Sequence, residues 1–348
     1  MRQSQIQTAF EQSRASTDSP ALPHCVYLDR QHAAAWLKAR QANPLAVISF
    51  AEPPSGSFGC PVISLDLPEL TEPSCLEVWS TTSAVHTYRD KEFSAAASSD
   101  VLFGTVTVDE EPGPGLDVLT DLAYRRILSL MQELAYPHLW RVWNYLPDIN
   151  GLAGGLERYR RFCLGRHRAL VDVLPGFPRS LPAGTAVGTR SGPLQIYFLA
   201  GTLPAAHLGN PRQIHAYEYP EDYGPRSPSF ARATLCRSES HSQLFISGTA
   251  SVVGHASRHA GLPEEQTRET IQNLRALLAH TESTARRHLT GEQSRAQYKV
   301  YVRNAAHLPA VRATLRAAPL ASDQILFLQG DLCRQELLVE IEGVITAS

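Results

Sequence analysis

The chain has 348 residues, of which 43% are hydrophobic and 19% are charged, and its formal net charge is −2. These values are typical of a soluble globular protein with room for two domains. No basic run or zinc-finger spacing indicates a nucleic-acid partner, and no apolar stretch approaches the roughly 20 residues of a membrane span. The six cysteines form no CxxC pair and the N-terminus has no signal-peptide core. We therefore expect a cytoplasmic protein with free thiols and without a membrane or nucleic-acid partner.

The first half of the chain predicts alternating strands and helices. Polar residues 1–22 predict a flexible N-terminal arm. Hydrophobic periodicity then predicts the elements that follow: a strand over 101–108, a helix ending near 134, a strand over 139–146 and a helix over 155–170. The Pro- and Gly-rich segment 173–193 predicts a linker.

The second half repeats this order of elements. Its predicted elements are a strand over 243–253, a helix beginning at Pro263, a strand over 297–304, a helix over 308–318 and a strand over 324–329. The repetition predicts an α+β fold of two related halves, each a mixed sheet with helices packed on one face. We expect domains at 23–180 and 181–348, with the active site near their interface.

Glu340 is an acid within the apolar strand sequence 337–342. The alternation of a strand puts Glu340 and Glu342 on one face, and we expect Glu342, near the strand end, to reach water. Burial would raise the pKa of Glu340 toward the range of a proton donor. A solvent-facing acid on an edge strand would give the same pattern.

Five arginines crowd the predicted helix 155–170. Like charges three or four positions apart repel, which indicates anions nearby. Arg160 and Arg166 lie off the most exposed arc, so we expect them to face a ligand. Glu157 and solvent are the alternative partners.

A second cluster lies on a loop rich in proline. Its residues are Tyr219, Tyr223, Arg226 and Arg232, and their hydroxyls and guanidiniums suit an anionic, oxygen-rich small molecule. A well-packed loop with surface arginines would have the same composition.

Three smaller features complete the candidate site. Gly248, after Ser247 at a strand end, would let a ligand come close, or it forms a bulge. Cys333 can cooperate with Glu340 only if a turn or bulge intervenes near 334–336; otherwise it is a small buried thiol. His255 and His259 lack a third ligand, so we expect no metal.

Several blocks, in one order, resemble the chorismatase family. They are VWNYLPDIN, GLERYRRFCLGR, YPEDYGPRSPSFARAT, LFISGTASVVGH, KVYVR and LCRQELLVEIEG. The match covers most of 100–348 and is weak over the first hundred residues. The C-terminal half is also similar to the reactive-intermediate deaminase fold, through SGTA and VEIEG.

The resemblance implies an enzyme that cleaves the enolpyruvyl ether of chorismate and releases pyruvate, without a cofactor. It makes Glu340 the acid that protonates the enolpyruvyl group. The arginines and tyrosines above, with Gly248 and Ser247, would bind the substrate.

Gly248 and Cys333 match the family members that form an aromatic product, whereas the hydrolytic members look to carry Ala at both positions. The resemblance thus implies 3-hydroxybenzoate, with Cys333 moving a proton during aromatisation. A mixture with 4-hydroxybenzoate, hydrolysis to a dihydroxycyclohexadiene carboxylate and a non-catalytic acid-binding module remain alternatives. The two halves within one chain favour a monomer.

Overall fold

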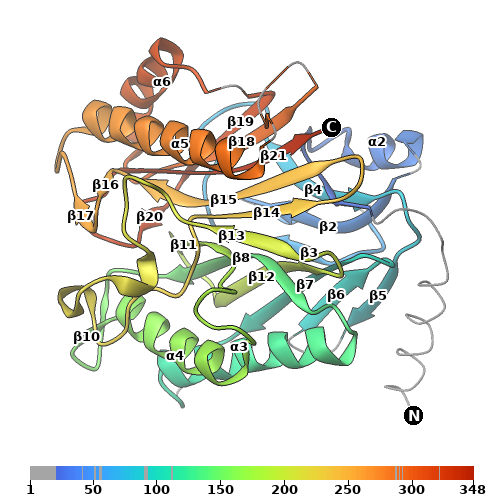
Figure 1. Cartoon of the computed structure of the whole chain (residues 1–348), viewed down its shortest axis with the longest axis horizontal. Helices are drawn as coiled ribbons and strands as arrows, with labels where there is room; N and C mark the ends of the chain where they lie inside the picture. Colours follow the sequence, from blue (N-terminus) through green and yellow to red (C-terminus); the bar gives the residue numbers. More distant parts are fainter. Residues whose placement is uncertain are drawn as a thin grey trace.

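The computed structural model describes residues 21–348, apart from 41, 51, 55–56, 90–92, 111–112, 287, 290, 292 and 321. Residues 1–20, which make up most of the predicted arm, lie outside the described part of the chain. Figure 1 shows the helices α5 and α6 on one side of the molecule and α3 and α4 on the other, with the strands between them.

An N-terminal sheet precedes the two predicted halves. Its strands run in the order β1 (His24–Asp29), β4 (Cys75–Thr81), β2 (Asn43–Ser49) and β3 (Val62–Ser64). The short helix α2 (Ala33–Arg40) covers one face, where it packs on Val47, Leu76 and Val78. The other face joins the central core of the protein.

The first half forms a seven-stranded sheet. Its strands, in spatial order, are β20 (Asp331–Leu332), β11 (Ala183–Thr189), β8 (His138–Pro147), β12 (Leu194–Gly201), β7 (Val101–Val108), β6 (Phe93–Ala97) and β5 (His86–Arg89). Helices α3 (Leu116–Glu133) and α4 (Arg158–Val173) pack on one face through a continuous apolar cluster.

The second half forms a six-stranded sheet. Its strands run in the order β13 (Ala205–Leu208), β14 (Ala233–Arg237), β15 (Ser242–Ala250), β21 (Val339–Ala347), β18 (Arg295–Val302) and β19 (Gln324–Gln329). Helices α5 (Pro263–Ala285) and α6 (Leu308–Ala317) cover one face with a core of their own.

The two halves share one topology, which confirms the predicted α+β fold of related halves. The order β5-β6-β7-β12-β8-β11 matches β13-β14-β15-β21-β18-β19 strand for strand. In both halves only the last pair, β8 with β11 and β18 with β19, is parallel, while the inserted strand pairs antiparallel on both sides.

The interpretation of 173–193 as a linker is wrong. Residues 183–189 form β11, buried along its whole length and paired with β8. Its small residues resemble a linker in composition, but they serve close packing: a Cβ on Gly184 would lie 3.1 Å from Arg166 Nη2. Strand pairing therefore crosses the predicted boundary at 180, since β11 and β12 belong to the sheet of the first half and β20, from residues 331–332, pairs with β11 at its edge.

The aromatic faces of the two sheets meet in the centre of the protein. Trp140 of β8 stacks on Phe245 of β15 with ring centroids 6.4 Å apart, and Trp79 of the N-terminal sheet lies 6.3 Å from the same ring. This shared core fixes the position of the two sheets relative to each other.

Short elements surround the open end of this core. They are the hairpin of β9 (Leu152–Ala153) and β10 (Leu156–Glu157), the hairpin of β16 (Val252–Val253) and β17 (Ala256–Ser257), and the 3-10 turns η1 (Ala216–Glu218), η2 (Glu221–Tyr223) and η3 (Ala305–His307). The predicted helix 155–170 begins at Arg158 because the first hairpin, with Gly154 and Gly155 at positive φ, occupies its first residues.

Candidate active site

A cavity of about 590 Å³ opens where the two halves meet. Strand β11 of the first half and strands β15 and β21 of the second reach it, and the β9–β10 hairpin and the loops 213–232 and 333–337 surround it. Eight of the predicted site residues line it: Arg160, Arg166, Tyr219, Tyr223, Arg232, Gly248, Cys333 and Glu340.

Two predicted site residues do not line the cavity. Arg226 is exposed on the loop before β14. Ser247 is fully buried, where its hydroxyl donates to Ala231 O at 2.5 Å and accepts from Gly184 N at 2.8 Å. The Ser247 hydroxyl thus joins the two halves, and we leave both residues out of the site.

Glu340 faces the cavity from the start of β21. It is 4% exposed, and no hydrogen bond or ion pair joins its carboxyl to another described residue. Burial, followed by the charge of Glu342, raises the pKa of Glu340 to about 8, although three arginines oppose the shift. The buried alternative for Glu340 is confirmed, and its carboxyl is protonated at neutral pH.

Glu342, expected to reach water, is instead 1% exposed in the central core. Its carboxylate pairs with Arg141 at 2.7 Å and with Lys299 at 2.7 Å, and it accepts a hydrogen bond from Trp143 at 2.9 Å. Burial alone would raise the pKa of Glu342, but the two cations outweigh it and lower the pKa. The prediction failed because β21 continues to Ala347, which leaves Glu342 in mid-strand opposite Lys299.

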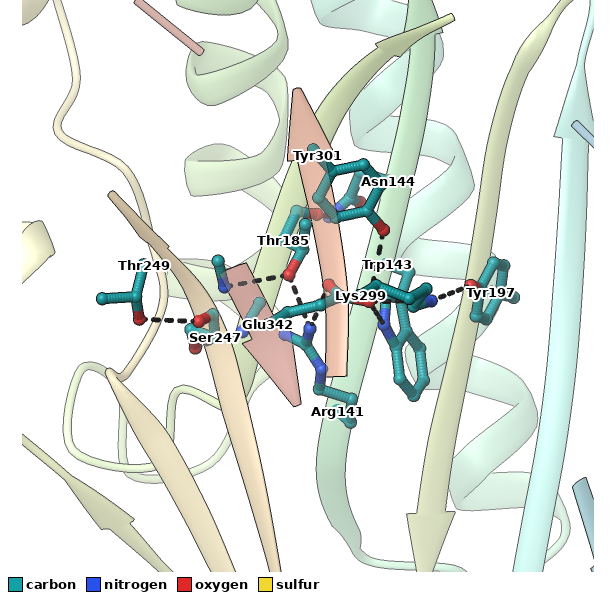
Figure 2. A network of polar contacts seen from close by, with 12 residues as sticks. Arg141, Trp143, Asn144, Thr185, Tyr197, Ser247, Thr249, Lys299, Tyr301 and Glu342 are labelled. Carbon is teal, nitrogen blue, oxygen red and sulfur yellow. Dashed lines mark hydrogen bonds and ion pairs between the residues drawn. The ribbon is translucent and has the colours of Figure 1, made fainter. Parts of the chain in front are cut away.

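Figure 2 shows this charge network between the strands. Lys299 also pairs with Glu77 of the N-terminal sheet at 2.8 Å, so two buried cations balance two buried carboxylates. All three sheets contribute a charged side chain, which explains why the network can stay buried.

Thr185 of β11 connects this network to the cavity. Its hydroxyl accepts from Arg141 Nη2 at 2.5 Å and from Gly248 N at 3.0 Å (Figure 2). Gly248 lies in the irregular part of β15, where the pairing with β21 shifts between Ile246 and Thr249. A Cβ at 248 would come within 2.8 Å of Glu340 Cδ and closer still to Oε1, so glycine leaves the acid its room.

Arg166 differs from the other arginines of α4. Arg158, Arg160, Arg161 and Arg168 each pair with a carboxylate. Arg166 is 2% exposed, its Nε and Nη2 atoms have no hydrogen-bond partner among the described residues, and it lies over the rings of Tyr124 and Phe162. A buried guanidinium without an anion is costly, which indicates that an anionic ligand completes this site.

Two further arginines line the cavity. Arg232 is buried and donates to Tyr219 Oη at 2.6 Å and to Ile214 O at 2.9 Å. Arg334 lies 4.0 Å from the ring centroid of Tyr223 and donates to His255 O at 2.9 Å. Neither makes an ion pair with a described carboxylate, so both can bind an anion.

Cys333 lines the cavity on the loop between β20 and β21. A turn closed by Leu337 N and Arg334 O at 3.1 Å lies between Cys333 and Glu340, as their cooperation requires. Burial and then the neighbouring Glu340 raise the pKa of the Cys333 thiol to about 12, so the thiol is protonated at neutral pH.

Sequence reasoning missed three residues of this region: Arg141, Thr185 and Arg334. Arg141 had a usable signal, because it is a lone charge within the apolar run 139–146, as Glu340 is within its own strand. Thr185 and Arg334 had none, since their importance comes from contacts between distant segments.

Among the described residues, no group of three or more His, Cys, Asp or Glu side chains is arranged to hold a metal ion. His259 pairs instead with Glu269 at 3.0 Å and His255 with the Tyr223 hydroxyl at 3.1 Å. No helix in the described ranges is long and apolar enough to cross a membrane.

Comparison with known proteins finds chorismatases both by sequence and by structure. Residues 77–200 match the family described as "Chorismatase FkbO/Hyg5-like, N-terminal". A protein named 3-hydroxybenzoate synthase, from Streptomyces hygroscopicus, is 36% identical over 315 residues, which cover 87% of this chain and 92% of that protein. A crystal structure of a chorismatase superposes with a TM-score of 0.81 at 30% identity, over 95% of this chain and all of the other.

A cavity with a buried, protonated carboxyl and with arginines that lack carboxylate partners has the chemistry to bind an anionic small molecule and to offer it a proton. The chain belongs to the chorismatase family. The structure of a YjgF-family protein from Neisseria meningitidis matches 42% of the chain, at 16% identity and a TM-score of 0.28.

Proposed function

We propose that the protein converts chorismate to 3-hydroxybenzoate and pyruvate. The name of the 36% identical relative supports this activity. The site supports it independently, because the reaction needs a proton donor and binding groups for two carboxylates.

Glu340 is the proposed proton donor. It transfers its proton to the terminal methylene carbon of the enolpyruvyl double bond, which forms an oxocarbenium ion. The ether bond to the ring then breaks, and its electron pair completes the carbonyl of pyruvate. A carboxyl whose pKa is about 8 holds its proton at neutral pH, and because its side chain is buried it can give this proton to an electron-rich carbon with little competition from water.

The arginines would bind the substrate carboxylates. Arg166, Arg232 and Arg334 line the cavity and supply three guanidiniums that make no ion pair with a described carboxylate. Arg160, which already pairs with Glu157, would contribute a weaker contact at the mouth. Fixed positive charges that bind the two carboxylates would orient the enolpyruvyl group toward Glu340.

Gly248 and Cys333 would determine which product forms from the ring of chorismate. Chorismate is an isomer of hydroxybenzoate plus pyruvate, so aromatisation needs no net water. The room beside Gly248 lets the oxygen of the ring hydroxyl, rather than a water molecule, attack the ring carbon that loses pyruvate, and the hydroxyl proton replaces the one that Glu340 gave up. The bond from this oxygen to its original ring carbon then opens, and the ring proton that is lost goes to the phenol oxygen. The protonated Cys333 thiol would then help to move a ring proton.

The observation that carries this proposal is the neutral carboxyl of Glu340 in a cavity walled by arginines that lack carboxylate partners. The purified protein should be incubated with chorismate and the products followed by ultraviolet absorbance and mass. 3-Hydroxybenzoate and pyruvate in equal amounts are expected. A dihydroxycyclohexadiene carboxylate would instead support the hydrolytic alternative, and a second aromatic isomer would support mixed 3- and 4-hydroxybenzoate formation.

A further inference from the structure

Arg303 follows directly after β18, and its side chain turns under the loop that carries Cys333. Its Nε donates to Leu337 O at 2.7 Å, and its Nη2 donates to Leu332 O at 3.0 Å and to Arg334 O at 2.9 Å. The two carbonyls bound by Nη2 belong to the neighbours of Cys333 on either side. One nitrogen therefore holds the main chain around the thiol.

The remaining donors of Arg303 connect this loop to the first half. Nη1 donates to Asn150 Oδ1 at 3.1 Å and pairs with Asp331 at 2.6 Å. Asn150 in turn donates to Leu332 O at 3.1 Å and to Glu157 Oε1 at 3.1 Å, and Glu157 pairs with Arg160. A chain of polar contacts thus runs from the Cys333 loop to the arginines of α4.

All five donors of the Arg303 guanidinium are matched by five acceptors, an arrangement that a lysine cannot reproduce. These hydrogen bonds hold the main chain of a loop that has strand structure only at its ends. Arg303 lies behind the loop and does not line the cavity.

We propose that Arg303 is a positioning residue for product choice: by holding the carbonyls on both sides of Cys333, it sets where the thiol lies relative to the ring of the substrate. The inference rests on the proposed role of Cys333 in forming an aromatic product. It adds a residue outside the cavity that acts on product choice through the thiol, and Arg303→Lys keeps the positive charge that Glu340 experiences from this position.

The test compares the wild type with Arg303→Lys, Cys333→Ala and the double variant, and measures the ratio of 3-hydroxybenzoate to the dihydroxycyclohexadiene carboxylate. Arg303→Lys should lower this ratio by about tenfold. A displacement of a reacting group by about 1 Å can cost roughly a hundredfold in rate, and we expect the thiol to move by less than that. In the Cys333→Ala background the same change should leave the ratio where Cys333→Ala alone puts it, because no thiol remains to be displaced.

Arg295→Lys is the matched control, since Arg295 lies at the other end of β18 in an ion pair with Asp323 on the surface. It should leave the ratio unchanged. If Arg303→Lys does not fold, Asn150→Ser removes the contacts of the Asn150 amide with Arg303 Nη1 and with Leu332 O and should lower the ratio in the same direction.

An unchanged product ratio in a folded Arg303→Lys protein would overturn the inference. A tenfold decrease of the ratio by Arg303→Lys in the Cys333→Ala background would overturn it as well. Failure of the proposed function looks different. In that case the wild type forms no aromatic product, or Cys333→Ala alone leaves the ratio at the wild-type value.

Discussion

Glu340 and Glu342 lie two residues apart on the same face of β21, and the fold keeps Glu340 neutral and Glu342 negatively charged. Glu342 is held as a carboxylate by Arg141 and Lys299, whereas Glu340 has no ion-pair partner among the described residues and its pKa is raised to about 8. The negative charge of Glu342 makes ionisation of Glu340 less favourable. The buried charge network behind the cavity therefore helps to keep the proposed proton donor protonated.

The pH dependence of kcat/KM should reflect the ionisation of Glu340 and its coupling to the charge of Glu342. Because Glu340 donates only when protonated, kcat/KM should fall by about tenfold per pH unit above a pKa of about 8. Removal of the neighbouring negative charge by Glu342→Gln lets Glu340 ionise more easily, which should move this descending limb to lower pH by about one unit or more.

Tyr301→Phe is the control for this shift. It removes a hydrogen bond of 3.2 Å to Glu342 without changing any charge, and should leave the limb in place. A limb that stays at the wild-type pH in Glu342→Gln would show that the charge of Glu342 does not act on the donor.

The stability of the protein should also depend on Glu340. The unfolded chain loses this proton near a pKa of 4.5 and the native state near 8, so the wild type loses stability as pH rises between these values. Glu340→Gln lacks this contribution. Its free energy of unfolding relative to the wild type should therefore rise by about 2–4 kcal/mol from pH 5 to pH 9. Denaturant unfolding at both pH values measures the difference, and a constant difference would mean that Glu340 ionises normally in the fold.

Gly248→Ala should change both rate and product. The added Cβ would lie within 2.8 Å of Glu340 Cδ, so the carboxyl must turn away from its place. We expect kcat to fall by about tenfold or more and the aromatic share of the product to decrease. Gly291→Ala is the control, because a Cβ there meets no atom within 4 Å. An unchanged rate and product in Gly248→Ala would argue against the importance of this contact.

Arg166→Met should weaken substrate binding without destabilising the free protein. Loss of a charged contact to a substrate carboxylate should raise KM by about 10- to 100-fold. The free protein should keep or raise its melting temperature, since the change removes a buried charge that lacks an anion. Arg168→Met on the same helix, where Arg168 is paired with Asp117 and largely exposed, should leave KM unchanged. A large loss of stability with an unchanged KM would assign Arg166 to the core instead.

Periodicity predicted most of the fold because the chain repeats regular apolar patterns. The strand 101–108 and the helix from Pro263 begin where the sequence indicates. The N-terminal sheet was not predicted, and β11 was misread, because its Gly, Ala and Thr residues reflect close packing against Arg166 and Phe230 rather than flexibility. Such contacts join segments far apart in the sequence.

The site was predicted where a residue is unusual in its own segment, as with Glu340 and the arginines of α4. Arg226 and Ser247 were included for their neighbourhood in the sequence, and the fold directs one to the surface and the other to backbone contacts. Arg141, Arg303 and Thr185 act through partners that no local pattern contains.

The central claim is that Glu340 supplies the proton, and pyruvate release by Glu340→Gln tests it most directly. Pyruvate should be measured from chorismate with equal amounts of the wild type, Glu340→Gln and Glu336→Gln, the last an exposed acid that also lines the cavity. We predict that Glu340→Gln loses turnover by about a thousandfold or more while chorismate still raises its melting temperature, and that Glu336→Gln stays close to the wild type. Pyruvate release by Glu340→Gln at the wild-type rate would contradict the account.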